Sequence, residues 1–183
     1  MPNGMARGLT LLEILTTMAV GAILFGIAVP GMANLIEQNR LTTHVNNLRA
    51  SLSLTRSHAV HENTHAVICK SADGLSCIRE GKWTQGWIVF ADDDRNRRRS
   101  EDERLLQVNQ AISTNTQIEY RAFGSRHYVT YRPSGMTRTN GTFYVCNPKA
   151  PKRSKALILR KSGRIRLSDT RADGKPIKCG DKP

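Results

Sequence analysis

Residues 8–30 read GLTLLEILTTMAVGAILFGIAVP, the longest apolar stretch of the chain. From Leu9 to Val29 it holds 21 residues, of which Glu13 alone is charged. At a rise of about 1.5 Å per residue, such a helix is about 30 Å long and can cross a bilayer. The apolar run is longer than that of a cleaved secretory signal. Because Arg7 precedes it, the positive-inside tendency places everything after Pro30 outside the cytoplasm.

The carboxylate of Glu13 is unusual, because a charge inside an apolar span is costly and needs a partner or a purpose. Snorkelling to the membrane edge is the plainer explanation. The run from Gly8 to Glu13, however, resembles a type IV prepilin signal, in which a short basic leader ends in Gly and Glu is the fifth mature residue. Pro30 resembles the kinking proline of pilin helices. The resemblance implies cleavage by a prepilin peptidase after Gly8, methylation of Leu9, and pairing of Glu13 with a neighbouring subunit's N-terminus during assembly.

Beyond Pro30 the pattern continues as an amphipathic helix. Apolar residues recur every three or four positions at Leu41, Val45, Leu48, Leu52 and Ala59, which gives one stripe that should pack on a sheet. We expect a single helix from Leu9 to about Val60, bent near Pro30. The expected organisation is a leader at 1–8, a membrane half-helix at 9–29, an amphipathic half-helix at 30–62 and a β-rich head at 63–183.

The head has the short, turn-bounded pattern of an antiparallel sheet system. We predict strands at His65–Lys70, Gly86–Ala91, Leu105–Gln110, Gln117–Ala122, His127–Arg132, Thr142–Cys146, Ala156–Lys161 and Arg164–Ser168. Together with the helix, they predict an α+β fold in which a long N-terminal helix packs on two antiparallel sheets in a sandwich-like pilin head.

Two segments of the head resemble the FimT and GspH branch of minor pilins. They are Trp83 with the stretch from Gly86 to Asn96, and Arg132-Pro133-Ser134-Gly135. The branch serves both DNA-uptake or twitching pili and the type II secretion pseudopilus, so membership leaves the function open. We expect Trp83 and Trp87 to lie in the core.

Four cysteines in an extracytoplasmic chain predict two disulfides, for which three connectivities exist. We choose Cys69 with Cys77, which closes a local hairpin, and Cys146 with Cys179, which ties the C-terminal tail to a strand. A zinc site is not expected, because no two cysteines have the spacing of a structural site.

The charge of the chain points to an acidic partner. Among 183 residues, 28 Lys and Arg stand against 15 Asp and Glu, which gives a net charge of +13. Between Lys149 and Lys182 the local net charge is +9. Reading a hairpin around Ser162-Gly163, we expect Ile158, Ile165 and Leu167 on one face, with Lys161, Arg164 and Arg166 on the other.

Arg164 and Arg166 lie two residues apart on a strand, about 6.6 Å from each other, and guanidinium groups bind phosphate oxygens bidentately. A solvated edge that keeps the strand soluble is the plainer alternative. Gly163-Arg164-Ile165-Arg166 also resembles the Gly-Arg-x-Arg element of FimT-like pilins, which implies DNA capture in natural transformation. The predicted DNA-binding set is Gly163, Arg164, Arg166, Lys161, Arg160, Lys155, Arg153, Lys152, Lys149 and Arg171.

The expected mechanism is binding of double-stranded DNA without sequence specificity at a pilus, followed by retraction. The implied partners are DNA, other major and minor pilins, the prepilin peptidase and the inner membrane of a Gram-negative cell, with the head in the periplasm before assembly and at the cell surface afterwards. Two alternatives stay open: a minor pseudopilin of type II secretion, and a subunit that primes pilus assembly without binding DNA.

Other chemistry is not expected. Asp92, Asp94, Asn96 and Glu103 match positions 1, 3, 5 and 12 of a calcium loop, but Arg97 replaces the turn glycine, so we expect a charged hairpin loop whose acids and arginines pair locally. The histidines at 58, 61 and 65 lack a carboxylate companion for a metal. No nucleophile stands with a base, so we expect no enzyme, no metal and no cofactor.

Overall fold

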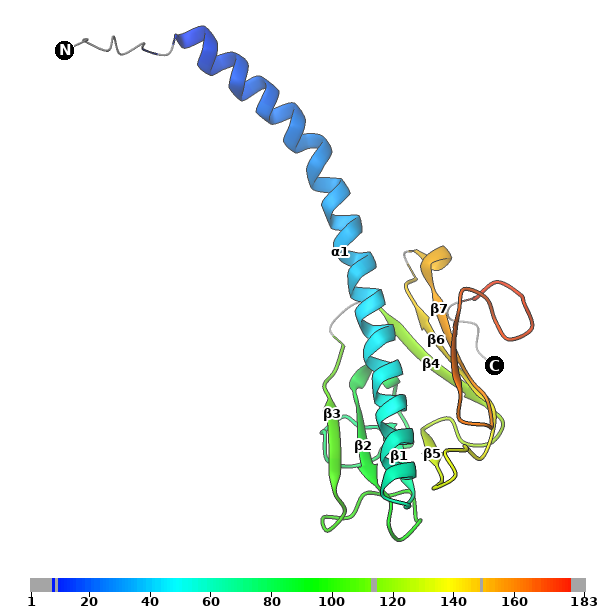
Figure 1. The fold of residues 1–183 in the computed structure, drawn as a ribbon. Helices are drawn as coiled ribbons and strands as arrows, with labels where there is room; N and C mark the ends of the chain where they lie inside the picture. The colour runs from blue at the N-terminus through cyan, green and yellow to red at the C-terminus, as the bar shows by residue number, and fades with distance from the viewer. Residues whose placement is uncertain (1–7, 9, 113–114, 149, 179–183) are drawn as a thin grey trace, which may run out of the picture. The chain divides into compact units, whose positions relative to one another are not determined.

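The structure is a computed structural model that describes residues 8, 10–112, 115–148 and 150–178; the side chains of 28–31, 33, 34, 37 and 38 are not described. The chain divides into two compact units, Met1–Arg40 and Leu41–Pro183. Helix α1 (Leu11–His61) contributes to both units and is continuous through Pro30 (Figure 1).

In the first unit, the large apolar side chains of α1 are exposed from Leu11 to Ile27. Within the described part of the chain, no helical stretch combines the length and apolarity of a bilayer span. The membrane segment expected at 9–29 stays a prediction.

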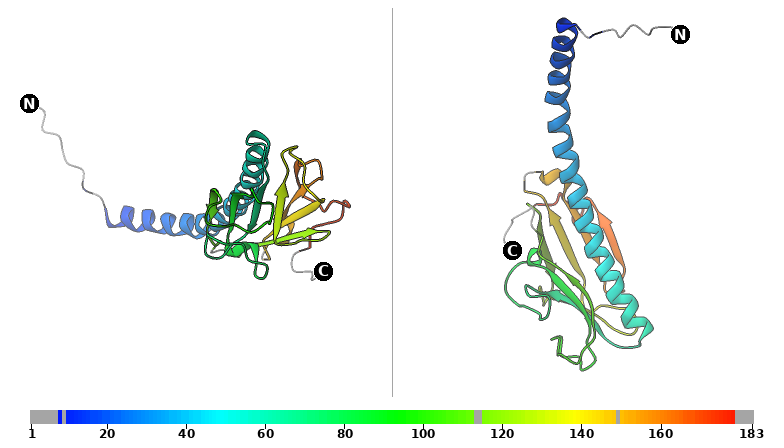
Figure 2. Two further views of the ribbon diagram at one scale, coloured as in Figure 1. Left: turned by 90° about the horizontal axis from the view of Figure 1, so that it is seen from below. Right: turned by 90° about the vertical axis from the view of Figure 1, so that its left-hand side faces the viewer.

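The second unit holds two antiparallel four-stranded sheets, and all eight predicted strands are present within two residues of their expected ends. The first sheet has the order β3-β2-β1-β5 and the second β4-β6-β7-β8 (Figures 1 and 2). The strands are β1 (Ala66–Lys70), β2 (Trp87–Ala91), β3 (Leu105–Asn109), β4 (Gln117–Ala122), β5 (Tyr128–Tyr131), β6 (Gly141–Cys146), β7 (Lys155–Leu159) and β8 (Ile165–Ser168).

The core lies where α1 meets both sheets. The predicted stripe is buried, with Leu48, Leu52 and Ala59 at 0% exposure, and it joins side chains of both sheets in one cluster. Burying a large apolar side chain stabilises the fold by about 1.5–3 kcal/mol. Trp83 and Trp87 belong to this cluster, and the Trp87 indole N–H donates to the Ser51 hydroxyl at 3.0 Å. Their predicted packing role is therefore confirmed.

The disulfide predicted between Cys69 and Cys77 is present. Cys69 lies in a second apolar cluster, on the opposite face of the first sheet from the core, with Val67, Ile88 and Phe90. Cys146 is buried on β6, but its predicted partner Cys179 lies outside the described residues, so that pairing stays a prediction.

Candidate nucleic-acid interface

The basic hairpin is formed by β7, β8 and a tight turn. The Arg160 N–H donates to the Arg164 carbonyl at 3.0 Å, and the Gly163 N–H donates to the Arg160 carbonyl at 2.8 Å. Gly163 has a φ of +79°, a left-handed conformation that glycine adopts without steric cost. The loop is thus three residues long, 161–163.

The register of this hairpin corrects one expectation. Leu159 pairs with Ile165, so Ile158 pairs with Arg166 across the two strands. Because opposite residues of an antiparallel pair share a face, Ile158 lies on the outer face with Arg166, while Leu157 and Leu159 lie on the core face with Ile165. Placing Ile158 with Ile165 was wrong, and so was placing Lys161 on one strand face with Arg164 and Arg166, because Lys161 lies in the loop.

A second turn holds the basic loop in place. A Cβ atom built on Gly163 would lie 1.9 Å from the carbonyl oxygen of Gly135, so the two turns touch at the backbone. The Arg56 side chain of α1 donates to that carbonyl at 3.1 Å, and the Thr137 N–H donates to the Lys161 carbonyl at 2.9 Å. Gly163 is buried by this contact. Gly163 therefore sets the conformation of the basic loop, and it is not itself available for contact with DNA.

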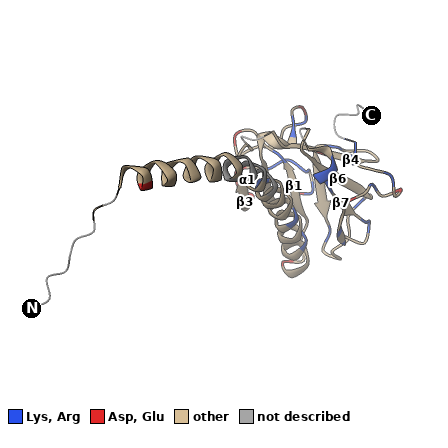
Figure 3. Cartoon of the chain, turned by 90° about the horizontal axis from the view of Figure 1, so that it is seen from above, with Lys and Arg blue, Asp and Glu red and all other residues tan. Residues whose placement is uncertain are grey.

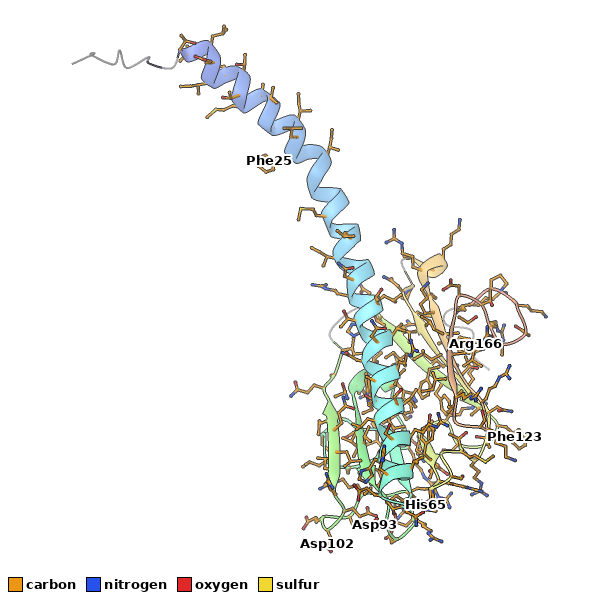
Figure 4. The ribbon with its side chains drawn as sticks, viewed as in Figure 1. Phe25, His65, Asp93, Asp102, Phe123 and Arg166 are labelled. Atoms are coloured by element: carbon orange, nitrogen blue, oxygen red, sulfur yellow. A yellow bond between two sulfur atoms is a disulfide. The ribbon has the colours of Figure 1, made fainter. Side chains whose placement is uncertain are left out.

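A broad groove of about 800 Å³ opens on the outer face of the second sheet. Across the four strands, Arg121, Thr142, Ile158 and Arg166 form one transverse row. At about 4.8 Å per strand, the row places Arg121 and Arg166 about 14 Å apart. Figure 4 shows Arg166 and Phe123 on the same side of the domain. The basic and aromatic residues that line the groove are Arg121, Phe123, Arg160 and Arg166.

The arginines that line the groove, and Arg164 in the adjoining turn, differ in how they are neutralised. Arg121 forms a two-pronged ion pair with Glu119, at 2.8 and 2.9 Å, and its guanidinium lies over the Tyr144 ring at 5.3 Å. Arg160, Arg164 and Arg166 are exposed, and in the part of the chain that the structure describes none of them pairs with a carboxylate. These three arginines therefore carry the positive charge that a polyanion would meet.

The other predicted cations do not gather at this groove. Lys152 and Arg153 lie on a 3-10 turn (Pro151–Arg153) that precedes β7, so they are about 20 Å along the strand from Arg160. Lys155 is ion-paired with Asp169. Arg171 lies in the turn after β8, where its N–H donates to the Lys175 carbonyl. Lys149 lies outside the described residues. Figure 3 shows how Lys and Arg are spread over this sheet and its turns.

Sequence reasoning missed two residues of the groove. Arg121 lies on β4 and Phe123 directly after it, roughly 40 residues before the basic hairpin, and only the sheet order brings them beside it. Phe123 is 92% exposed, which is unusual for an aromatic side chain. It also borders a second hollow, of about 400 Å³, together with Arg97 and Arg138. A solvent-exposed aromatic between two arginine-lined hollows indicates a binding surface.

At the start of α1, Glu13 has a local role that the prepilin pattern did not predict. The Thr10 N–H and hydroxyl donate to Glu13 Oε2 at 3.3 and 3.2 Å, and the Glu13 N–H donates to Thr10 Oγ1 at 3.3 Å. This reciprocal arrangement is a capping box, which starts the helix. The Thr-x-x-Glu spacing was its signal. Gly8 is exposed, and Leu9 lies outside the described residues.

Comparison with known proteins agrees with this architecture. Residues 44–163 match the family model described as type II transport protein GspH. The chain belongs to the GspH family. As a member of that family, it is a minor pilin or pseudopilin of the FimT/GspH type, and it combines the expected N-terminal helix with two antiparallel sheets. A search of curated proteins finds no match for this chain.

Two solved structures share the fold of this GspH-family chain. The type IV minor pilin FimU of Pseudomonas aeruginosa PAO1 is 22% identical over 72% of this chain and 90% of its own, with a TM-score of 0.55. The minor pseudopilin EpsH of the Vibrio cholerae type 2 secretion system is 9% identical over 70% of this chain and 96% of its own, with a TM-score of 0.51. At these identities, the likeness is one of fold.

Proposed function

We propose that this minor pilin binds DNA through the groove on the outer face of its second sheet and delivers it to the cell during DNA uptake. The observation that carries the proposal is the position of Arg160, Arg164 and Arg166, which are exposed and unpaired with acids among the described residues. Guanidinium groups bind phosphate oxygens bidentately, so this surface suits a polyphosphate backbone.

The groove is broad and open, and nothing in its shape selects a base sequence. Its contacts come from arginines spread over about 14 Å, which is typical of phosphate contacts that fix position without reading bases. We therefore expect binding that is independent of sequence and sensitive to salt. Four phosphate contacts would lose about two orders of magnitude in affinity between about 50 and 200 mM salt.

The test is an electrophoretic shift titration of the purified full chain with a duplex at several salt concentrations. The paired substitution Arg160→Gln with Arg166→Gln should weaken binding and lower the slope of log affinity against log salt by about 1.8, which corresponds to two phosphates. Arg79→Gln with Lys82→Gln is the matched control, because it removes the same charge from the exposed loop between β1 and β2. Equal losses in both variants, or no loss in the first, would contradict the proposal.

A second function is favoured by the family description, which names type II transport. In that case the head would contact exported proteins in a pseudopilus, and the arginine groove would be a solvated surface. The two functions separate in cells that carry the groove variant. Loss of transformation with normal piliation and normal secretion supports DNA uptake, whereas loss of secretion alone supports the pseudopilus.

In either machine, the chain must enter a fibre and associate with other pilins. The exposed apolar side chains of α1 from Leu11 to Ile27 support this, because such a surface needs lipid or neighbouring subunits to cover it. Anchoring in the inner membrane, cleavage after Gly8 and methylation of Leu9 belong to the same proposal, as does pairing of Glu13 with a neighbouring N-terminus. In the free chain, Glu13 is hydrogen-bonded to Thr10, and pairing with a neighbouring N-terminus would replace these hydrogen bonds.

A further inference from the structure

The loop that joins β2 to β3 brings three acidic side chains together. Carboxylate oxygens of Asp92, Asp94 and Glu103 lie within 4.8 Å of one another. Asp92 and Glu103 are buried, with 1% and 6% of their surface exposed, while Asp94 faces solvent. A cluster with one open side and two buried members is accessible to a small ion from solution.

One oxygen of this cluster has no partner. Asp92 Oδ1 accepts the Arg97 N–H at 2.9 Å, but Asp92 Oδ2 is buried and no hydrogen bond reaches it. Buried polar groups are nearly always paired, so an unpartnered oxygen on a buried carboxylate that clusters with two further carboxylates suits a bound cation. Burial raises the pKa of Asp92, and the Glu103 and Asp94 carboxylates raise it further, against the opposing Arg97 hydrogen bond.

The nearby arginines do not supply that cation, contrary to the expected local pairing. The Arg97 guanidinium donates to the Tyr128 hydroxyl at 2.9 Å and lies over its ring, and Arg99 donates to the Leu75 carbonyl. Over residues 8–178, as far as they are described, no lysine or arginine forms an ion pair with any of the three acids.

The lack of a turn glycine at position 97, which argued against a calcium site in the sequence, is not an obstacle in the structure. Arg97 stands where a calcium loop has its turn glycine, yet its φ is +64°, the left-handed conformation that the glycine would provide. Glu103 is oriented by the N–H groups of Asp93 and Ser100, each donating at 3.0 Å to a different carboxylate oxygen. Each of those oxygens keeps a lone pair for a metal ion.

We infer that the β2–β3 loop binds one calcium ion through Asp92, Asp94 and Glu103. The set contains only hard carboxylate oxygens, which suit Ca²⁺ and not zinc or copper. The loop connects two strands rather than two helices, so it shares the ligand spacing of an EF-hand without its fold. Backbone carbonyls and water would complete the six to eight ligands that Ca²⁺ takes, and the expected dissociation constant is about 10⁻⁴–10⁻³ M, as in extracellular modules.

The test is calorimetric titration of the full chain with calcium chloride, with thermal unfolding measured in calcium and in chelator. We expect saturable binding of one ion and a higher Tm in calcium, because a ligand that binds only the folded state stabilises it. Asp94→Asn should weaken binding at least about tenfold. Asp94 is exposed, so its amide preserves the fold.

The matched control is Asp102→Asn, which removes the same charge from an exposed position of the same loop, labelled in Figure 4. It should leave the affinity within about twofold. The inference is overturned if the full chain shows no saturable binding up to about 10 mM calcium. It is also overturned if both variants lose affinity equally, or if magnesium chloride binds as tightly as calcium. The DNA affinity of the groove variants is measured separately, so the calcium proposal and the DNA proposal can each fail without the other.

Discussion

The Cα atom of Gly163 packs against the carbonyl oxygen of Gly135, so closely that a methyl group on Gly163 would overlap it, at 1.9 Å. This backbone contact joins the basic loop to the turn that carries Arg132 and Pro133. It explains why a glycine stands in front of Arg164: the residue must have a positive φ and no side chain.

Gly163→Ala should therefore destabilise the head and weaken DNA binding without removing any charge. Left-handed strain costs about 1–2 kcal/mol and the overlap adds about 1–3 kcal/mol, which together lower Tm by several degrees. Gly174→Ala is the control, since Gly174 has a similar φ of +82° but open space around its Cα. Thermal unfolding followed by circular dichroism measures both. Equal shifts in Tm would show that the contact contributes nothing.

Phe123→Ala tests the exposed aromatic of the groove. Because the side chain is 92% exposed, its removal should change the free energy of unfolding by less than about 0.5 kcal/mol. If an unpaired base stacks on the ring, affinity for single strands should fall by the equivalent of about 1–3 kcal/mol and recover in Phe123→Trp. Fluorescence anisotropy with single-stranded and duplex probes separates the two DNA forms. Leu75→Ala, at another exposed apolar residue, should change neither affinity.

Replacing both Cys69 and Cys77 by Ala should lower the free energy of unfolding by up to about 2.5 kcal/mol, the loop-closure value for a separation of 8 residues. The loss should approach this limit because Asp73 also keeps the reduced loop ordered in the folded state. Its carboxylate accepts the N–H groups of Leu75 and Ser76, and hydrogen bonds from Ser76 hold its pKa well below the usual range.

Urea unfolding of that double variant, with and without Asp73→Asn, measures both contributions. A disulfide loss that is unaffected by Asp73→Asn would mean that the carboxylate does not order the reduced loop. In the intact protein, Asp73→Asn alone should cost about 1–3 kcal/mol, as expected for hydrogen bonds to a charged group.

The histidines should make stability depend on pH near neutrality. Burial lowers the pKa of His127, and Lys70 and Arg79 lower it further; burial also lowers the pKa of His58 and His65. The folded state thus binds fewer protons than the unfolded state. The stability from this source is present above the unfolded value of about 6.5 and is lost as pH falls below it.

We expect Tm to decline between about pH 7.5 and 5.5, and His127→Gln to flatten part of that decline. Glutamine keeps a hydrogen-bonding group near the Ser125 hydroxyl, which lies 3.1 Å from His127 Nδ1. A decline that is equally steep in the variant would assign the effect to other groups. Measuring above pH 5 keeps the titration of ordinary carboxylates out of the window.

Much of the fold could be predicted from the sequence because its signals are local. The helical stripe through Leu48 and Leu52 follows from residue spacing, and the strands follow from short runs bounded by glycine, asparagine and proline. The signal for the capping box at Thr10 and Glu13 was equally local, but the prepilin resemblance had assigned Glu13 to pairing with a neighbouring subunit.

The candidate site was harder to predict because it depends on pairing between distant strands. No local signal specifies that β4 lies in the sheet of the basic hairpin, so Arg121 and Phe123 could not be assigned to the groove. The face of Ile158 depends on whether the loop holds two or three residues, since one residue of register reverses every side chain. The positive φ of Arg97 could not be predicted either, because residues other than glycine rarely adopt a positive φ.

The hydrogen bond from Arg56 to Gly135 has a mechanical consequence. Gly163 of the basic loop packs on Gly135, and Gly135 accepts a hydrogen bond from Arg56, so the loop is connected to α1 through two backbone turns. If the chain binds DNA as proposed, tension applied at Arg164 would pass through these two backbone turns into α1.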